Sequence, residues 1–200
     1  HPKSDDLFAK AHDLTLEQLT KLKRDWLEML ASARSNRSET HPAPVRDPKA
    51  LTSWNALLVM GWKEAHWAQP NAGFDRKALD LLDRLSTAIH DSEGLRHQYT
   101  DGNASGEGFL DDYATMGLAY LAGYELSGQS QFLDRARDLA HQIESRFGVH
   151  QGSPFYYYAQ GKAPEWERNV EIEDNVIPSA NALTAQFFLE LSDHLDIPSY

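Results

Sequence analysis

Hydrophobic positions along the chain predict helices of two kinds. In two segments, about 75–90 and 130–147, apolar residues form one stripe at helical spacing and charged residues occupy the other faces. Three further segments, about 51–67, 109–127 and 178–195, have no broad polar face. A one-sided helix packs at a surface, whereas a helix that is apolar all round is buried. The pattern therefore predicts three buried helices that alternate with two surface helices.

The N-terminal part of the chain follows a different pattern. Residues 1–13 are expected to be a disordered or loosely ordered lead-in segment. Thr15 and Gln18 then approximate a capping box at the start of a helix that ends in the polar tract 35–40. The proline-rich tract 41–48 cannot continue that helix. We therefore expect a helix separated from the rest of the chain by a connection without regular structure.

The loops before the two later buried helices carry β-like patterns. Leu95, His97 and Tyr99 alternate with polar residues, and the following Asp101-Gly102 is a strong turn signal. The second loop contains the strand-like run 155–158 and a turn at 160–162. Short hairpins are expected only in these two loops. We take a sheet of four or more strands to be incompatible with this architecture.

The buried helices begin near residues 52, 110 and 179, which gives a repeat of roughly 60–70 residues. Buried and one-sided helices that alternate in antiparallel pairs predict an all-α double layer, with inner helices covered by outer ones. Because the pairs are antiparallel, all inner helices run in the same direction. Their N-termini should therefore open onto one end of the layer.

Composition excludes several classes of function. The chain has 200 residues, a formal net charge of −11 and no cysteine. The charge and the lack of a Lys/Arg cluster argue against nucleic acid binding, and the missing thiols exclude disulfides and thiol catalysis. No apolar run is long enough to span a membrane, and no signal peptide is evident. We expect a cytoplasmic protein without a membrane partner.

No cofactor or metal site is expected. The nine histidines show no spacing typical of metal ligands, and the chain contains no phosphate-binding loop, dinucleotide fingerprint or nucleophile elbow.

Polar and aromatic residues gather where the inner helices are expected to begin. Carboxylates, amides, hydroxyls and aromatic rings in a concave site suit a polyhydroxylated ligand such as a small sugar. The candidate catalytic residues are Asp112, Glu173, Asp174 and His97. The candidate substrate-binding residues are Asp47, Trp54, Asn55, Tyr113, Tyr157, Ser179 and Asn181.

Several of these residues also have a purely structural interpretation. Ser53 and Ser179 are reasonable helix caps, and a tryptophan such as Trp54 is more often a core residue than a platform for a ligand. Asp111 and Asp112 lie about 100° apart on a helix, so both cannot face the same pocket. The sequence leaves open which of the two does.

The dipole of the inner helix favours an ionised Asp112, which suits a base, a nucleophile or a hydroxyl acceptor. Glu173 is the candidate for an acid partner, and His97 is the imidazole best placed to take part in catalysis.

Three stretches resemble the C-terminal part of the YyaL-type proteins, relatives of the spermatogenesis-associated thioredoxin-like protein. They read DPKALTSWNAL at 47–57, GFLDDYA at 108–114 and IPSANA at 177–182. The family pattern reads D-D-K-x-L-T-S-W-N-G-L, G-F-L-E/D-D-Y-A and P-S-G-N-S. The resemblance spans roughly residues 35–195.

Departures from the family pattern include Pro48, which replaces an acid, and Ala56 and Ala180, which replace glycines. These 200 residues do not include the thioredoxin-like domain usual in the family. The resemblance implies an α/α toroid of six helical hairpins, similar to N-acylglucosamine 2-epimerases and six-hairpin glycosidases. Residues 14–200 would then form a partial toroid domain.

The resemblance implies a domain that binds or processes carbohydrate, as a sugar epimerase or isomerase or as a glycoside hydrolase. The alternative is a non-catalytic interaction scaffold that accompanies a thioredoxin-like domain. The repeat supplies about three of the six hairpins of a closed ring. We therefore expect self-association through exposed apolar residues of the last inner helix, such as Phe187, Phe188 and Leu191.

Overall fold

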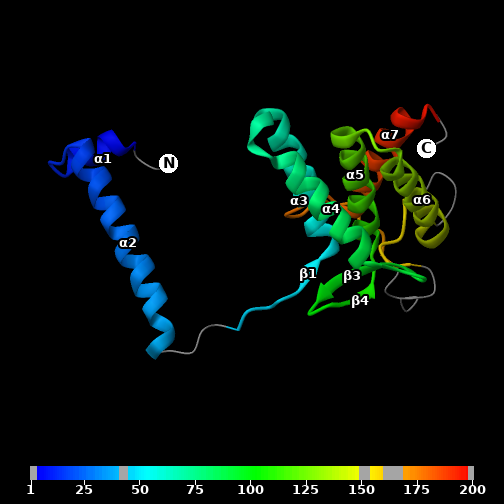
Figure 1. The fold of residues 1–200 in the computed structure, drawn as a ribbon, viewed down its shortest axis with the longest axis horizontal. Coiled ribbons are helices and arrows are strands. Elements are labelled where there is room, and N and C mark those ends of the chain that lie inside the picture. The colour runs from blue at the N-terminus through cyan, green and yellow to red at the C-terminus, as the bar shows by residue number, and fades with distance from the viewer. Residues whose placement is uncertain (1–3, 41–44, 149–153, 160–168, 198–200) are drawn as a thin grey trace. The chain divides into compact units, whose positions relative to one another are not determined.

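The computed structural model describes residues 4–40, 45–148, 154–159 and 169–197. They group into two compact units, an N-terminal unit of residues 1–47 and a helical unit of residues 48–200 (Figure 1). The domain expected at 14–200 runs across this division.

The N-terminal unit consists of α1 (Asp5–Ala11) and α2 (Leu16–Thr40). The predicted capping box is present, because Thr15 N–H donates to Gln18 Oε1 (2.8 Å) and Gln18 N–H donates to Thr15 Oγ1 (3.1 Å). A loosely ordered lead-in at 1–13 was expected, and α1 differs from that expectation. Ser4 Oγ caps the N-terminus of this short helix by accepting a hydrogen bond from Leu7 N–H. The spacing of hydrophobic residues alone does not predict such a cap.

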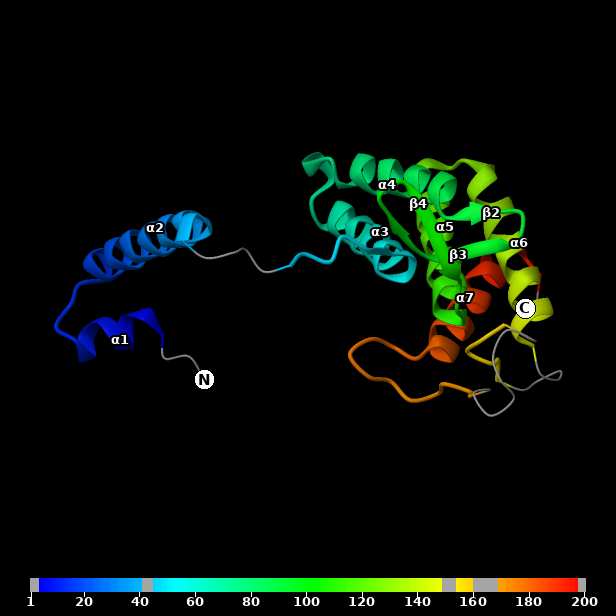
Figure 2. The ribbon, with the colours of Figure 1, turned by 90° about the horizontal axis from the view of Figure 1, so that it is seen from below.

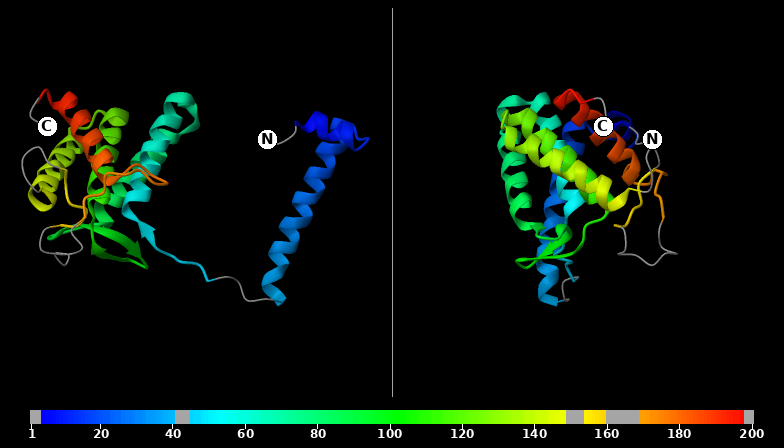
Figure 3. Two further views of the ribbon diagram at one scale, coloured as in Figure 1. Left: turned by 180° about the vertical axis from the view of Figure 1, so that it is seen from behind. Right: turned by 90° about the vertical axis from the view of Figure 1, so that its right-hand side faces the viewer.

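The helical unit contains five α-helices and a short 3-10 turn, Pro70–Ala72, among its described residues. The helices are α3 (Thr52–Ala68), α4 (Phe74–Ala88), α5 (Leu110–Ser127), α6 (Ser130–Phe147) and α7 (Ala180–Leu195). Helices α3, α5 and α7 run in one direction, and α4 and α6 run in the opposite direction (Figures 1 and 3). This is the predicted alternation of inner and outer helices.

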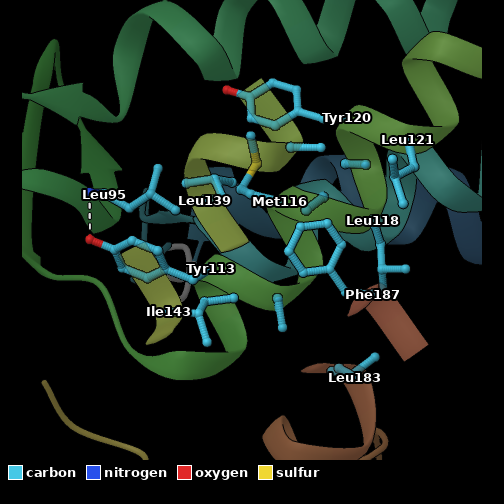
Figure 4. Packing of buried hydrophobic residues seen from close by; sticks show 14 of the residues in the cluster. Leu95, Tyr113, Met116, Leu118, Tyr120, Leu121, Leu139, Ile143, Leu183 and Phe187 are labelled. Carbon is cyan, nitrogen blue, oxygen red and sulfur yellow. Dashed lines mark hydrogen bonds between the residues drawn. The ribbon is translucent and has the colours of Figure 1, made fainter. Parts of the chain in front are cut away.

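Helix α5 is the centre of the core, and it packs against α3, α4, α6 and α7. Every residue from Leu110 to Gly123 is buried, as the all-round apolar pattern predicts. Figure 4 shows Tyr113, Met116 and Tyr120 of α5 inside the cluster, with Phe187 of α7 beside them. Gly117 permits this packing, because a β-carbon at that position would collide with the Phe187 ring.

Two expectations about the inner helices were wrong. Phe187 and Leu191 of α7 are fully buried rather than exposed, because they face α5. Helix α3 is not buried all round, since Trp54 and Leu58 are exposed on it. Within the described residues, α3 packs on α4, α5 and the sheet, and these neighbours cover only part of its surface.

The sheet is small and lies at the N-terminal end of the inner helices (Figure 2). Strands β3 (Gly94–Thr100) and β4 (Asn103–Glu107) form the predicted hairpin around Asp101-Gly102. Strands β1 (Ala50–Leu51) and β2 (His90–Asp91) each pair antiparallel with β3.

The sheet thus has four strands, and our exclusion of such a sheet was wrong. Two of its strands are only two residues long, and they extend the ends of helices rather than form a separate layer. The predicted strand at 155–158 is also absent. Tyr156 N–H donates to Phe147 O and Tyr157 N–H donates to Asn169 O, both at 3.0 Å, in a non-strand conformation. The turn expected at 160–162 lies outside the described residues.

Candidate functional site

Hydrogen bonds join the N-terminal ends of the three inner helices. Ser53 N–H in the first turn of α3 donates to Asp112 of α5 (3.0 Å). Leu110 N–H at the start of α5 donates to the carbonyl of Tyr157 (3.0 Å). Asn181 in the first turn of α7 binds the backbone of Phe155 in the same loop segment. The three first turns are therefore neighbours, as the repeat predicts, although about 60 residues separate them in the chain.

Asp112 is the buried junction of this arrangement. Its side chain is fully buried, and Oδ1 accepts the Ser53 N–H. Its other oxygen, Oδ2, accepts the N–H of Phe109 (3.0 Å) and contacts His97 Nδ1 (2.8 Å). Asp112 thus caps its own helix, binds the next inner helix and orients an imidazole from the sheet. Both of its oxygens are occupied by protein groups.

His97 projects from β3 toward the start of α5. Its ring packs on Phe109, with 4.7 Å between the ring centroids, and 24% of its side chain remains exposed. The hydrogen bond to Asp112 raises the pKa of His97, and the charges of Asp112 and Asp111 act in the same direction, whereas burial and Lys49 oppose the shift. Because Nδ1 faces Asp112, Nε2 is the nitrogen left for a ligand.

Asp111, the neighbour of Asp112, is in a different electrostatic state. It is 9% exposed, and burial raises its pKa from 3.8 to about 6, with the charge of Asp112 as the second cause. The hydroxyls of Ser53 and Tyr157 partly offset this shift. Its buried Oδ1 has no hydrogen-bond partner among the described residues. A carboxyl in such surroundings can exchange a proton near neutral pH.

Aromatic rings surround this pair of carboxylates. Tyr157 stacks on Phe109 at 5.1 Å between centroids, and Tyr158 packs edge-on against Phe109 at 5.2 Å. Burial and the charge of Asp111 raise the pKa of the Tyr157 hydroxyl, so it is a proton donor in hydrogen bonds. Trp54, in the first turn of α3, is 65% exposed. It is therefore not the core residue of the alternative interpretation.

Tyr113 and Asn55 do not face these groups. The Tyr113 ring is buried against Phe147, and its hydroxyl accepts the N–H of Leu95 (3.0 Å). Asn55 donates to Leu51 O (2.7 Å) and lines a cavity of about 700 Å³ beside α4 and Tyr99. Both side chains hold the scaffold in place rather than line one pocket with Asp112.

Residues at the start of α7 are mostly engaged in backbone contacts. Ser179 Oγ accepts Ala182 N–H (3.2 Å), as the capping interpretation predicts, and Asp174 accepts Ser179 N–H (2.9 Å). The Asn181 amide donates to the carbonyls of Phe155 and Glu171. These groups secure the loop against α7.

The two remaining candidates are exposed. Glu173 lies on the loop that precedes α7. Asp47 belongs to the N-terminal unit, whereas every other candidate belongs to the helical unit.

Sequence reasoning named Asp111 but did not select it, and it missed Phe109. The signal for Asp111 was the adjacent pair of acids at a buried helix start, where the capping residue and the second acid must point in different directions. Phe109 gave a weaker signal, as an aromatic residue immediately before that pair.

Cavities and metal ligands give no further support to the site within the described residues. Three cavities whose lining lies in the described part of the chain, of about 330, 700 and 460 Å³, include none of Asp111, Asp112 and His97. No group of three or more potential metal ligands occurs in the described part of the chain. No described helix is long and apolar enough to cross a membrane.

Comparison with known proteins gives relatives at low identity. No protein family model matches the chain. It is 29% identical to spermatogenesis-associated protein 20 of Homo sapiens, over 93% of this chain and 25% of the relative, and 28% identical to the Mus musculus protein. An uncharacterised Caenorhabditis elegans protein, B0495.5, is 26% identical over 98% of this chain and 27% of its own length. The chain spans about a quarter of the length of these relatives.

A solved structure shares the fold. The cellobiose 2-epimerase of Bacillus thermoamylovorans superimposes with a TM-score of 0.57 over 74% of this chain and 42% of that chain, at 13% identity. At this identity the likeness establishes the fold alone. The chain is thus similar over most of its length to spermatogenesis-associated protein 20, and its fold is that of an α/α toroid.

Proposed function

We propose that the helical unit carries a carbohydrate-processing site centred on Asp111 and His97, and that its reaction is a sugar epimerisation or isomerisation. One observation carries the proposal. A buried carboxyl with an unpaired oxygen, Asp111, lies in the electrostatic field of an imidazole that Asp112 orients through Nδ1.

The order of the two pKa values assigns the roles. The pKa of Asp111 is about 6, and that of His97 is raised above its ordinary 6.5. Between these values Asp111 is ionised and His97 is protonated. Asp111 is therefore the base, and His97 Nε2 is the acid. In this assignment Asp112 is a positioning residue, and His97 takes the acid role expected for Glu173.

The proposed step needs one base and one acid. Asp111 takes the proton from the carbon next to the sugar carbonyl while His97 protonates the carbonyl oxygen, which gives an enediol. After the enediol turns over, Asp111 returns the proton to the opposite face of the same carbon, which gives the epimer, or it returns the proton to the former carbonyl carbon, which gives the isomer. In both cases the hydroxyl proton of the oxygen that becomes the carbonyl is lost to His97. No oxidant or leaving group is involved, so the atoms balance.

A glycoside hydrolase would need two available carboxyl groups about 5–10 Å apart on either side of the bond. Asp112 has both oxygens occupied, and Asp174 accepts a backbone N–H of Ser179. Glu173 is exposed on the loop before α7. The arrangement favours proton transfer next to a carbonyl.

The substrate class we propose is a reducing sugar. Phe109 packs on His97, and the half-buried Tyr157 stacks on Phe109, so apolar ring faces are available beside the acid–base pair to pack against a sugar. Trp54 adds an exposed ring in the first turn of α3. The name of the cellobiose 2-epimerase that shares the fold agrees with this class. We also propose that the chain corresponds to the toroid part of a YyaL-type protein.

The test is deuterium exchange. The 200-residue chain is incubated with glucose, mannose and cellobiose in D2O, and deuterium at the carbon next to the carbonyl is measured by NMR. We expect exchange that Asp111→Asn and His97→Gln each reduce by at least about 100-fold, since acid–base groups contribute about 10²–10⁴-fold. Asp134→Asn, on the exposed face of α6, should leave the rate unchanged. Equal rates in all variants would contradict the assignment.

The second candidate is the interaction scaffold. It is favoured by the exposed apolar side chains of Trp54, Leu58 and Leu189 on α3 and α7 (65%, 43% and 66%), which form potential contact surfaces. Light scattering separates the two candidates. Association that Leu58→Asp and Leu189→Asp abolish, in a chain that exchanges no deuterium into any sugar, would favour the scaffold.

A further inference from the structure

A polar cavity, separate from the candidate site, lies on the outer side of α5 between α4 and α6. Its volume is about 330 Å³, within the range of small-ligand sites. It shares no residue with the candidate site at Asp111 and His97. Its polar lining consists of Ser86, His90, Tyr120, Arg135, Asp138 and Gln142.

Tyr120 supplies the observation that points to a ligand. Its ring is 1% exposed and stacks on Phe132 at 6.3 Å between centroids. Its hydroxyl oxygen is buried and has no hydrogen-bond partner among the described residues. In Figure 4 this hydroxyl points away from Leu118 and Leu121, out of the apolar cluster. A buried hydroxyl without a partner destabilises the fold, so the cavity in front of it should hold a group that accepts its proton.

Positive charge is present in the same cavity. The Arg135 guanidinium lies over the Tyr120 ring, 5.8 Å from its centroid. No described carboxylate forms an ion pair with Arg135 within 4.0 Å, although Asp138 lines the same cavity. His90 is exposed as a residue, but partial desolvation of its imidazole by the surrounding protein and the charge of Arg135 lower its pKa, against the opposing charge of Asp91. His90 is therefore neutral at pH 7 and can donate or accept one hydrogen bond.

We propose that this cavity binds a small hydroxycarboxylate. The carboxylate would accept hydrogen bonds from Arg135 and the Tyr120 hydroxyl, which are donors without a described carboxylate partner. The hydroxyl group of the ligand would donate to Asp138, which also disfavours a ligand with two negative charges. A guanidinium is well suited to a planar carboxylate because it presents paired N–H donors.

The experiment titrates the 200-residue chain with glycolate and follows the backbone and His90 signals by NMR. We expect saturable binding. Tyr120→Phe removes only the unpaired hydroxyl and should weaken binding by about tenfold, the value of a hydrogen bond to a charged group. Arg135→Gln should abolish binding. Tyr124→Phe removes a hydroxyl from the same helix outside the cavity and should leave the affinity unchanged.

Melting temperatures show whether each variant is folded, and we expect that of Tyr120→Phe to be unchanged or raised. The proposal is overturned by three results: shifts that do not saturate, equal affinity in Tyr120→Phe, or tighter binding of inorganic phosphate than of glycolate. Shifts that do not saturate would mean that the Tyr120 hydroxyl has only an ordered water as its hydrogen-bond partner. A failed deuterium-exchange assay would have no bearing on this titration, because the two sites share no residue.

Discussion

Carboxylates join the inner helices at both ends, and the two ends differ in how completely their charges are paired. Toward the C-terminal ends, Glu125 of α5 contacts Lys63 of α3 through Oε2 (2.9 Å) and His194 of α7 through Oε1 (3.2 Å). Burial opposes the shift, but Lys63 lowers the pKa of Glu125 overall. Each oxygen of this carboxylate has a partner with a side chain that can carry positive charge.

At the N-terminal ends, one of two adjacent carboxyls binds an imidazole, and the other acts on that imidazole only through its charge. Asp112 takes the hydrogen bond of His97 and two backbone N–H groups, and Asp111 keeps an unpaired buried oxygen. Carboxylates that only join helices do not need a buried oxygen without a hydrogen-bond partner. The comparison therefore separates a structural clamp, centred on Glu125, from a junction that also holds a carboxyl ready for proton transfer.

The largest expected effect is that of Asp112→Asn. The amide keeps one acceptor oxygen, but its NH2 group then faces backbone donors, and His97 loses its charged partner. Removing one member of a buried pair costs about 3–5 kcal/mol, and we expect a loss of about 3 kcal/mol in the free energy of unfolding. Urea denaturation at pH 7 measures it. A loss below about 1 kcal/mol, the size of an ordinary surface substitution, would mean that the junction does not hold α3 to α5.

We expect Asp111→Asn to raise the free energy of unfolding, whereas Asp112→Asn lowers it. The raised pKa means that folded Asp111 stays protonated between pH 3.8 and about 6 while the unfolded chain ionises. The stability of the wild type therefore falls as pH rises through this window, and the cost stays constant above it. The variant lacks this cost, so it should be more stable at pH 7, by on the order of 1–3 kcal/mol. Wild type and variant should converge below pH 3.8.

Urea midpoints of the wild type and Asp111→Asn from pH 3.5 to 7.5 measure this difference. A constant difference across the range would show that Asp111 titrates as an ordinary carboxyl. The same variant should lose deuterium exchange. A gain in stability with a loss of activity is the signature expected of a strained catalytic group.

The sequence predicted the arrangement of helices better than the roles of single residues. The pattern from 109 to 127 gives the buried α5 directly, because no face of it is polar. The choice between Asp111 and Asp112 was not available from the sequence. It depends on Ser53, 59 positions away, and on His97 in the hairpin. Adjacent residues of the same type carry no local signal about which one meets those partners.

The prediction that Phe187 and Leu191 of α7 are exposed was wrong for a related reason. Phe187 is apolar whether it lies at an open edge or in the core, and its packing depends on the space left by Gly117 on α5. A glycine inside an apolar helix permits a close approach, but the sequence does not say by which side chain. Whether an apolar side chain is buried thus depends on which helices pack together, and the hydrophobic periodicity of a single helix does not predict that pairing.

The smallest expected effect is that of Glu125→Gln, and it tests the other side of the comparison. The Lys63 and Glu125 side chains are 17% and 28% exposed, so salt in the solvent can partly screen their attraction. Such pairs contribute about 1 kcal/mol or less, and Lys63 also keeps Glu64 at 3.4 Å. We expect urea denaturation to show a loss of about 1 kcal/mol or less at low salt, which shrinks further in 1 M NaCl. The loss caused by Asp112→Asn should persist in that salt because Asp112 is fully buried. Equal salt sensitivity of the two variants would contradict the distinction between clamp and junction, as would any loss of deuterium exchange in Glu125→Gln.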